Sequence, residues 1–374
     1  MHKKLISLGL MSGTSGDGVD ASVIITNGLN EYDSIKDKYY EYDIKIYKDI
    51  HNLKEKIHKI EDLEVYKNEI DNLERRITVF HAEVIKDLNI SDETIVGFHG
   101  QTIYHNPKEK ISRQLANGKL LNQLVKKNVV YDFRANDILN EGQGAPLTPI
   151  FHHLISHQNK IELPVCFLNI GGISNITIVT DKNDLSKLKS KDIGPGNCLI
   201  DNWVRKNSNK KFDLDGKIAL MGKRNEIFFE QAQELYTNRK NKKKLSYDTN
   251  DFDISFLRGL SFEDGVTTLT DFTASIIGDE LSSSFRNFKN KEQDILLCGG
   301  GRKNKVLIKK IEKNLLPNIN LKLIDEYKVD GDFIESQAFA FLAVRSLLQL
   351  PISFPNTTGC KIPCTGGKLI KKLN

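Results

Sequence analysis

Residues 8–25, LGLMSGTSGDGVDASVII, place a glycine-rich turn between two apolar segments. The segment Lys4 to Met11 before the turn is apolar, and the segment Ala21 to Thr26 after it is rich in β-branched residues. β-Branched residues favour strands, and glycines permit the positive φ angles of a tight turn. The sequence therefore predicts an N-terminal β-hairpin and argues against a strand that leads directly into a helix.

The turn itself combines glycines with hydroxyl side chains and two aspartates. Such a segment packs poorly, but its exposed main-chain N–H groups can point at an oxyanion, which predicts a phosphate-binding turn. An ordinary surface turn is the alternative. The lysine of a Walker loop, GxxxxGK[ST], is missing here, so the predicted cradle is a β-turn.

Two later segments repeat parts of this pattern. Residues 165–180, VCFLNIGGISNITIVT, predict a second hairpin around a glycine pair, and residues 294–304, DILLCGGGRKN, predict a strand that opens through glycines into a helix. Repeated hairpins suggest two similar lobes. The third segment alone is a weak dinucleotide-loop signal, because it does not match GxGxxG.

Other elements follow from periodicity and composition. Apolar residues between positions 53 and 80 recur every three or four positions, which predicts one long amphipathic helix or two in succession. Residues 94–105 and 129–132 are predicted strands. The charged, glycine- and proline-containing passage 134–149 predicts a domain boundary near residue 134.

Length and charge narrow the class of protein. A chain of 374 residues exceeds the ordinary size of one core, which predicts two domains. No apolar run approaches the ~18 residues that a membrane span needs. The net charge of +5 comes from interspersed charges, and the basic run 238–244 has no stacking aromatic residues, so a solvated loop is expected there rather than a nucleic-acid site.

The N-terminus and the cysteines favour a reducing compartment. The start resembles a signal peptide only superficially, because its apolar stretch is about seven residues long, and we interpret it as the first strand. The five cysteines form neither CxxC pairs nor an even disulfide count, which fits a reducing cytosol and implies no zinc site.

Eight motifs occur along the chain in a fixed order: GLMSGTSGDGVD, FHGQT, DFRANDI, GQGAPL, NIGGISNIT, DIGPGNCLID, DGVTTLT and CGGGRKN. Each motif alone is weak. Their joint order, from residue 8 to at least residue 304, resembles the anhydro-N-acetylmuramic acid kinases, and weaker similarities follow at ESQAFAFLA and FPNTTGC.

The resemblance implies an α/β, two-lobed actin-like (ribonuclease H-like) ATPase fold, with duplicated mixed sheets and flanking helices around an interlobe cleft. It implies an N-terminal lobe of residues 1–134 plus about 345–374 and a C-terminal lobe of residues 135–344. The implied cofactors are ATP and Mg²⁺. The implied partners are an anhydro-amino sugar and a second copy of the chain, with neither nucleic acid nor membrane, in the cytoplasm.

The implied reaction belongs to peptidoglycan recycling. Water adds across the internal ether of 1,6-anhydro-N-acetylmuramic acid, and the γ-phosphoryl group of ATP is transferred to the freed 6-oxygen, which gives N-acetylmuramic acid 6-phosphate. Phosphoryl transfer depends mainly on positioning and on neutralising charge, so main-chain N–H groups and hydroxyls suit the phosphate site.

The resemblance assigns the phosphate-binding residues. The first set is Ser12, Gly13, Thr14, Ser15, Gly16, Asp17, Gly18 and Val19. Asp17 is the preferred metal ligand, because hard cations bind carboxylate oxygen and Asp17 lies inside the turn, whereas Asp20 is expected to pin the next strand. At Gly16 the chain departs from the family, which commonly has a larger apolar residue there.

Glycines also mark the second phosphate-side hairpin and the adenosine side. The hairpin set is Asn169, Gly171, Gly172, Gly194 and Gly196, and the adenosine-side set is Gly299, Gly300 and Gly301. The adenosine-side glycines would leave room for the base and ribose, and tight helix-to-strand packing is the alternative. Asn175 satisfies a turn or joins the hairpin set.

Asp192, in DIGPGN, is the expected catalytic base. Opening the anhydro ring requires a carboxylate that takes a proton from water as the water attacks the anomeric carbon, as in an inverting glycosidase. The γ-phosphoryl group would capture the leaving oxygen in place of a second acid. Alternatively Asp192 only caps the following glycine turn. Ile193 stands where the family usually has threonine.

Glu335 is either a second active-site carboxylate or an N-terminal helix charge.

Four polar residues are expected to meet the sugar: His99, Gln101, Arg134 and Asp137. Arg134 suits the lactyl carboxylate of a muramic acid, because a guanidinium binds a carboxylate in bidentate fashion. A salt bridge between Arg134 and Asp137 that joins the lobes is the alternative. As an alternative, a histidine such as His99 is more often a hydrogen-bonded core residue than a catalyst.

Two other functions compete with the kinase. A catalytically silent sugar-binding regulator on the same fold is disfavoured by the retained Asp192 and the complete glycine turn. A nucleotide-dependent oxidoreductase that uses CGGGRKN as a dinucleotide loop is disfavoured because no suitably placed acidic residue follows on a second strand.

Overall fold

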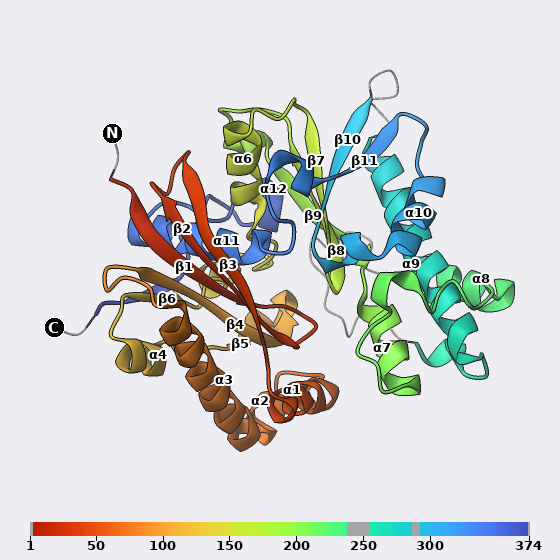
Figure 1. Ribbon diagram of the computed structural model, residues 1–374, viewed down its shortest axis with the longest axis horizontal. Helices are drawn as coiled ribbons and strands as arrows, with labels where there is room; N and C mark the ends of the chain where they lie inside the picture. The colour runs from red at the N-terminus through yellow and green to blue at the C-terminus, as the bar shows by residue number, and fades with distance from the viewer. Residues whose placement is uncertain (1–2, 238–253, 286–291, 373–374) are drawn as a thin grey trace. The chain divides into compact units, whose positions relative to one another are not determined.

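The computed structural model describes residues 3–237, 254–285 and 292–372, and the chain divides into two compact units (Figure 1). Unit 1 comprises Met1–Glu162, Asp181–Lys189 and Phe333–Asn374. Unit 2 comprises Leu163–Thr180 and Ser190–Asp332. The basic run 238–244 lies outside the described residues.

Unit 1 is built on a mixed, seven-stranded sheet in the order β12-β6-β4-β1-β2-β3, with β5 paired to β4. The predicted N-terminal hairpin is confirmed, since β1 and β2 pair antiparallel with Leu10 opposite Ala21. β4 runs parallel to β1, and β6 runs parallel to β4. The strands are β1 (Leu5–Ser12), β2 (Gly18–Thr26), β3 (Tyr32–Glu41), β4 (Ile95–Asn106), β5 (Ile111–Leu115), β6 (Val129–Tyr131) and β12 (Lys368–Ile370).

Helices cover both faces of this sheet. The helices of unit 1 are α1 (Ile44–Lys56), α2 (Asp62–Val65), α3 (Lys67–Leu88), α4 (Gly118–Val125), α5 (Ala135–Leu139), α6 (Pro149–Gln158), α11 (Ile334–Leu347) and α12 (Pro355–Thr358). Of the two alternatives predicted for residues 53–80, one long helix or two in succession, the structure has successive helices. α1 ends where Ile57 is extended, and the next two backbone N–H groups donate to the Asp62 carboxylate, which starts a new helix.

The alternation of side chains along β1 explains the two-sided packing. Leu8 and Leu10 are completely buried in the cluster that α1 and α3 complete. Gly9, between them, points to the opposite face and lies against α11, where a Cβ atom would come within 1.9 Å of the Ser336 carbonyl oxygen. A side chain at position 9 would push the helix away, so the glycine permits this close approach.

Unit 2 repeats the strand order of unit 1. Its five-stranded sheet has the order β11-β10-β7-β8-β9, which matches β6-β4-β1-β2-β3, and β7 and β8 form the predicted second hairpin. The strands are β7 (Val165–Ile170), β8 (Ile173–Val179), β9 (Lys189–Pro195), β10 (Gln293–Cys298) and β11 (Ile319–Leu323). The helices are α7 (Cys198–Asn207), α8 (Glu226–Thr237), α9 (Phe262–Ser284) and α10 (Lys305–Lys313). The expected duplication of a mixed sheet is confirmed.

The first boundary between the compact units lies later in the sequence than the expected lobe boundary near residue 134. Residues 135–162, 181–189 and 333–344, expected in the second lobe, belong to unit 1. Aromatic packing accounts for the difference, because the Phe151 ring of α6 lies 4.8 Å from Tyr32 on β3 and 5.7 Å from Phe341 on α11.

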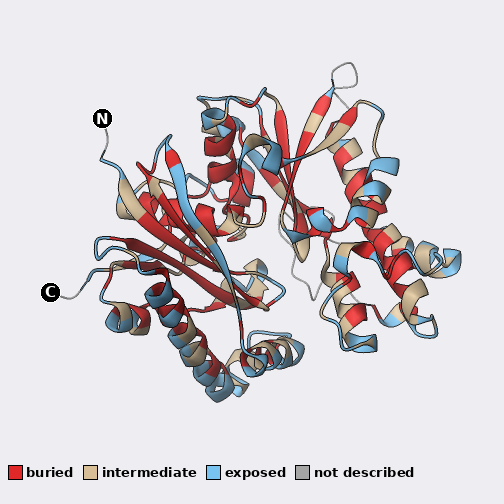
Figure 2. Cartoon of the chain, viewed as in Figure 1, coloured by how far each residue is buried: buried red, intermediate tan, exposed pale blue. Residues whose placement is uncertain are grey.

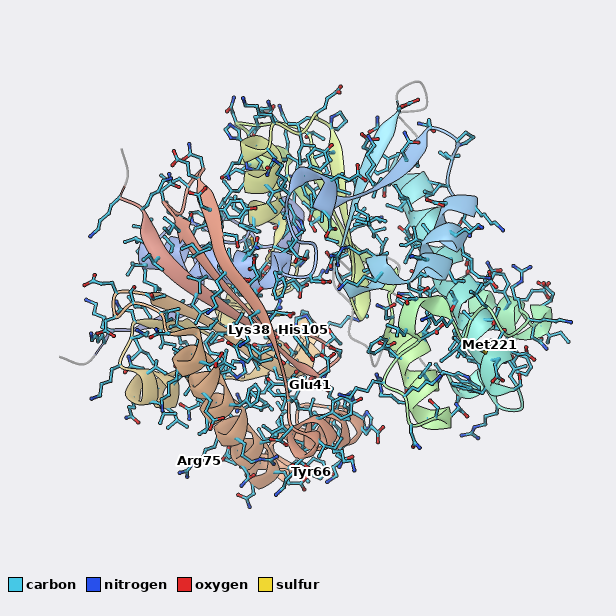
Figure 3. All side chains as sticks on the ribbon, in the orientation of Figure 1. Lys38, Glu41, Tyr66, Arg75, His105 and Met221 are labelled. Carbon is cyan, nitrogen blue, oxygen red and sulfur yellow. The ribbon has the colours of Figure 1, made fainter. Side chains whose placement is uncertain are left out.

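Burial is concentrated in the central strands, whereas the outer strand β3 is largely exposed (Figure 2). β3 lies at one end of the unit 1 sheet and carries several charged residues, including Lys38 and Glu41 (Figure 3). Charged side chains on an edge strand discourage pairing with another chain. Among the described helices, none has the length and apolar character of a membrane span.

Candidate active site

The turn between β1 and β2 is short and held by its own backbone. The Gly16 N–H donates to the Gly13 carbonyl at 3.1 Å, and Gly16 has φ +63°, a conformation that suits glycine. Ser15 Oγ donates to Asp17 Oδ1 at 2.5 Å, so the carboxylate lies beside the hydroxyls of the turn. A Cβ atom on Gly13 would meet nothing closer than Ser15 Oγ at 3.9 Å, so the backbone there is open to a ligand.

Gln101 braces this turn from the neighbouring strand β4. Its side chain is completely buried, its Oε1 lies 2.6 Å from Ser12 Oγ, and its Nε2 donates to the Gly13 carbonyl at 3.0 Å. Tyr42 adds a further hydrogen bond, from its hydroxyl to Ser12 Oγ at 3.1 Å. Gln101 was expected to meet the sugar, and the structure gives its amide to the predicted phosphate turn.

A lysine adds positive charge to the same turn. Lys54 Nζ, on α1, donates to the Thr14 carbonyl at 2.8 Å. Sequence reasoning missed Lys54 and Tyr42, because each is separated from the turn by many residues and neither belongs to a recognisable motif. Together with the open backbone at Gly13 and the Asp17 carboxylate, these groups fit a phosphate and a hard cation.

The second hairpin, in unit 2, is tied to the start of α7. The Gly171 carbonyl accepts from the Asn197 N–H at 2.8 Å, and the Gly172 carbonyl accepts from the Gly196 N–H at 2.9 Å. Gly196 has no room for a side chain, because a Cβ atom would lie 2.2 Å from the Gly171 carbonyl oxygen. Gly171, Gly172 and Gly196 therefore form one connected backbone unit.

The three adenosine-side glycines have different surroundings. A Cβ atom on Gly299 would lie 2.3 Å from Asn169 Oδ1, and one on Gly301 would lie 2.3 Å from the Ile170 side chain. These two positions fit the packing alternative. A Cβ atom on Gly300 would have nothing within 4 Å, so Gly300 is the position of the three that faces open space.

Asp192 lies in β9 with 8% of its surface exposed, and Gly194 follows it with φ +149°. Ile193 is 1% exposed and belongs to the core cluster of the unit 2 sheet. Neighbouring side chains of a strand point to opposite faces, so Asp192 points away from that core. Ile193 is thus a packing residue, and its departure from threonine is accounted for by the core it fills.

His99 and Arg134 form a buried pair in unit 1. His99 Nε2 accepts from Arg134 Nε at 3.1 Å and from Nη2 at 2.9 Å, while His99 Nδ1 donates to the Gly100 carbonyl at 2.7 Å. The Phe339 ring packs on the imidazole with centroids 4.5 Å apart. Burial, together with the Arg134 charge, holds the pKa of His99 well below its usual value, so the imidazole is neutral.

Arg134 and Asp137 meet at the backbone of Gly144. Asp137 is 1% exposed, and its Oδ2 accepts from the Gly144 N–H at 2.7 Å while its Oδ1 accepts from Thr358 Oγ1 at 2.6 Å. Arg134 Nη1 donates to the Gly144 carbonyl at 2.6 Å. The two side chains thus hold opposite ends of one residue in the GQGAPL loop.

Glu335 lies in the first turn of α11, as expected for a residue at a helix start. The next residue, Ser336, is fully buried and its Oγ lies 2.6 Å from Ser22 Oγ on β2, which fixes this end of the helix against the sheet.

The expected site residues divide between the units. The structure brings Ser12–Val19, Gln101, His99, Arg134, Asp137 and Glu335 into unit 1, and Asn169, Gly171, Gly172, Asp192, Gly194, Gly196 and Gly299–Gly301 into unit 2.

The two units share one strand order, and each has a glycine turn after its first strand. The family described as Anhydro-N-acetylmuramic acid kinase matches residues 5–372. The chain belongs to this family, and it is a kinase that uses ATP.

Curated relatives match this chain over nearly its full length. The chain is 56% identical to an anhydro-N-acetylmuramic acid kinase of Pelagibacter ubique, with 99% of this chain and 100% of the relative covered. It is 34% identical to the kinase of the same description in Agrobacterium fabrum, with 98% of each chain covered.

Solved structures with low identity were also found. One is component A of (R)-2-hydroxyglutaryl-CoA dehydratase from Acidaminococcus fermentans, with 12% identity, a TM-score of 0.42, and 92% of this chain and 99% of that chain covered. Another is a hexokinase from Schistosoma mansoni complexed with glucose, with 10% identity, a TM-score of 0.41, and 91% of this chain and 85% of that chain covered.

Proposed function

We propose that the protein hydrolytically opens 1,6-anhydro-N-acetylmuramic acid and phosphorylates its 6-oxygen with ATP, giving N-acetylmuramic acid 6-phosphate and ADP in peptidoglycan recycling. The observation that carries the proposal is the family match over residues 5–372, which spans every residue assigned a role below. We further propose that it works in the cytoplasm as a homodimer, as its motifs imply.

The β1–β2 turn holds the phosphates in this proposal. The main-chain N–H groups and hydroxyls of Ser12–Val19 surround phosphate oxygens, and the second hairpin, with Asn169, Gly171, Gly172, Gly194 and Gly196, supplies further main-chain donors. Gly300 borders the adenosine, because its neighbourhood is open, with Gly299 and Gly301 shaping the loop. Asp17 would hold Mg²⁺, which would supply positive charge to neutralise the phosphates.

Asp192 acts as the base. Its carboxylate takes a proton from water as the water oxygen bonds to the anomeric carbon, and the bond from that carbon to the 6-oxygen breaks. The 6-oxygen then bonds to the γ-phosphorus and ADP leaves. Glu335 serves as the second carboxylate, at the N-terminal end of α11.

Arg134 binds the lactyl carboxylate, since its guanidinium is already oriented by His99 and Gly144. His99, Gln101 and Asp137 act as positioning residues in this scheme. His99 accepts from Arg134, Gln101 donates to the phosphate turn, and Asp137 accepts from the Gly144 loop.

The experiment is a mass analysis of the product. The full chain is incubated with ATP, Mg²⁺ and anhydro-N-acetylmuramic acid, and the sugar is expected to gain both water and phosphate. No such product from the folded wild-type protein overturns the proposed reaction.

Asp192→Asn tests the base separately. We expect turnover to fall about a hundredfold or more, because a positioned general base contributes about that much. Asp294→Asn is the matched control on the same sheet, where the carboxylate pairs with Lys322 at 2.6 Å, and it should keep its activity. Undiminished turnover in Asp192→Asn refutes the base role while leaving the reaction in place.

A further inference from the structure

Three side chains with metal-binding atoms meet in the interior of unit 1. The Asp137 carboxylate and the thiols of Cys360 and Cys364 have their ligand atoms within 4.8 Å of one another, and all three residues are buried. Asp137 lies on α5, whereas the two cysteines follow α12, so the cluster joins segments far apart in the sequence.

The backbone holds these segments together without a metal. Gly359, with φ +79°, ends α12 and turns the chain towards Cys360. The Cys364 N–H donates to the Ser353 carbonyl at 3.0 Å, and the Gln143 N–H donates to the Thr358 carbonyl at 2.8 Å. The ligand atoms are therefore brought close by contacts that do not depend on a bound ion.

Ser353 supplies a second, independent indication of a ligand. Its hydroxyl is 1% exposed and has no hydrogen-bond partner in the described structure. It lies beside Cys364, because Ser353 and Cys364 face each other in an antiparallel bridge in which the Cys364 N–H donates to the Ser353 carbonyl at 3.0 Å. A buried polar atom without a partner is unfavourable, and a cation or a cation-bound water at this point would satisfy it.

The chemistry of the donors selects the cation. Burial raises the pKa of the Cys360 thiol and that of Cys364, the latter to about 12, and the Asp137 charge raises both further. Both thiols are thus protonated until a cation replaces their protons. Two thiolates and one carboxylate suit zinc, whereas Mg²⁺ prefers oxygen ligands alone.

The cluster can contract to the required size. Ligands at about 2.0–2.3 Å from a tetrahedral zinc ion lie about 3.3–3.8 Å from one another, so atoms within 4.8 Å need an inward movement of about 1 Å. Side-chain rotations of this size do not require the backbone to move.

We propose that Asp137, Cys360 and Cys364 bind one thiophilic divalent cation of the zinc class, with Ser353 Oγ, or a water bound to it, at the fourth position. Two thiol protons pass to solvent for each cation bound. This site is additional to the proposed Mg²⁺ site at Asp17, and it does not depend on the proposed reaction. The site includes the Asp137 carboxylate, which accepts from the Gly144 N–H. A bound cation would therefore stiffen the loop that orients Arg134.

Titration with Co²⁺ tests the site in the full chain. The protein is treated with a chelator, kept under a reductant that prevents disulfide formation, and titrated with Co²⁺ as the probe. We expect a thiolate-to-cobalt charge-transfer absorption that saturates at one equivalent and disappears when Zn²⁺ displaces the cobalt. Wild-type protein without this absorption overturns the proposal, and that measurement requires no variant to fold.

Variants then locate the ligands. Cys360→Ser and Cys364→Ser should each lower Co²⁺ affinity at least tenfold and weaken the absorption. Cys166→Ala is the control, because Cys166 is also a buried free cysteine but lies on β7 of unit 2, away from the cluster. Absorption that survives in Cys364→Ser and is lost in Cys166→Ala contradicts the assignment.

Discussion

Arg134 donates two hydrogen bonds to the same atom, His99 Nε2, from Nε at 3.1 Å and from Nη2 at 2.9 Å. This arrangement requires an unprotonated Nε2, and Nδ1 then donates to the Gly100 carbonyl. The neutral imidazole is therefore a clamp for the guanidinium and is not positioned as a proton donor. The buried His99 side chain therefore orients the Arg134 guanidinium.

Arg134→Lys should weaken sugar binding, because lysine cannot make the paired contacts of a guanidinium. Losing charge-assisted hydrogen bonds worth about 1.5–3 kcal/mol would raise KM for the anhydro sugar about 10- to 100-fold. KM for ATP should stay within about twofold. Steady-state kinetics with each substrate varied in turn provides the measurement.

Arg113→Lys is the matched control for this substitution. Arg113 is also partly buried, but it lies on β5 opposite Tyr104 and donates to the Glu74 carboxylate at 2.8 Å and to the Gln114 carbonyl. If both lysine variants raise KM for the sugar equally, Arg134 has no specific role in binding it.

Acid should destabilise unit 1 through its buried histidines. Burial lowers the pKa of His81 to about 4 and that of His152 to about 3, and His99 is also shifted well down. Unfolded histidine binds a proton near pH 6.5 and the folded groups do not, so stability is full above pH 6.5 and falls as the pH drops towards 4. Each of the first two residues should cost up to about 3 kcal/mol by pH 4.

Urea unfolding at a series of pH values measures this loss. His81→Phe isolates one contribution, because His81 is completely buried and packs on the ring of Phe98 at 4.7 Å. The variant should unfold with a weaker pH dependence between 6.5 and 4. A dependence as steep as that of the wild type would show that His81 is protonated in the folded state.

Gly300→Ala should separate stability from nucleotide binding. A Cβ atom at this position meets nothing within 4 Å, so the free energy of unfolding should change by less than about 0.5 kcal/mol. A methyl group in the space proposed for adenosine should raise KM for ATP about fivefold or more. Unchanged KM for ATP would place the nucleotide elsewhere.

Gly9→Ala, in contrast to Gly300→Ala, should lower the free energy of unfolding. A Cβ atom here would come within 1.9 Å of the Ser336 carbonyl and 2.5 Å of the Ala340 nitrogen, both in the backbone of α11. The helix would have to move, at a cost of about 3 kcal/mol or more. Thermal unfolding of Gly9→Ala and of Gly300→Ala under the same conditions measures the difference. Equal melting temperatures would contradict this packing.

Sequence patterns predicted the elements whose signals are local. Both glycine hairpins, β4, β6, and the strand-to-helix segment after Cys298 follow from apolar runs and glycines that are near one another in the chain. The exposed strand β3 was not predicted, because its charged residues do not resemble a buried strand. The break between α1 and α3 was left open, because periodicity continues through it.

The detailed roles in the site depend on contacts between distant residues. Gln101 reaches Ser12 across the sheet, and Asp137 meets Thr358 near the C-terminus. The Asp137 cluster is a further example: the spacing of Cys360 and Cys364 alone implied no zinc site, because Asp137 lies on α5, far from both cysteines in the sequence. Amino-acid order does not report such pairings without the fold.

The contact between Gly9 and α11 also constrains the order of assembly during synthesis. The helix that covers this face of the first sheet is encoded after all of unit 2, so a ribosome has made the second unit before the first can close. Until then the N-terminal strands present an uncovered apolar surface. A chain that stalls before α11 is made would thus be expected to bind chaperones, even though strands β1–β6 have already been made.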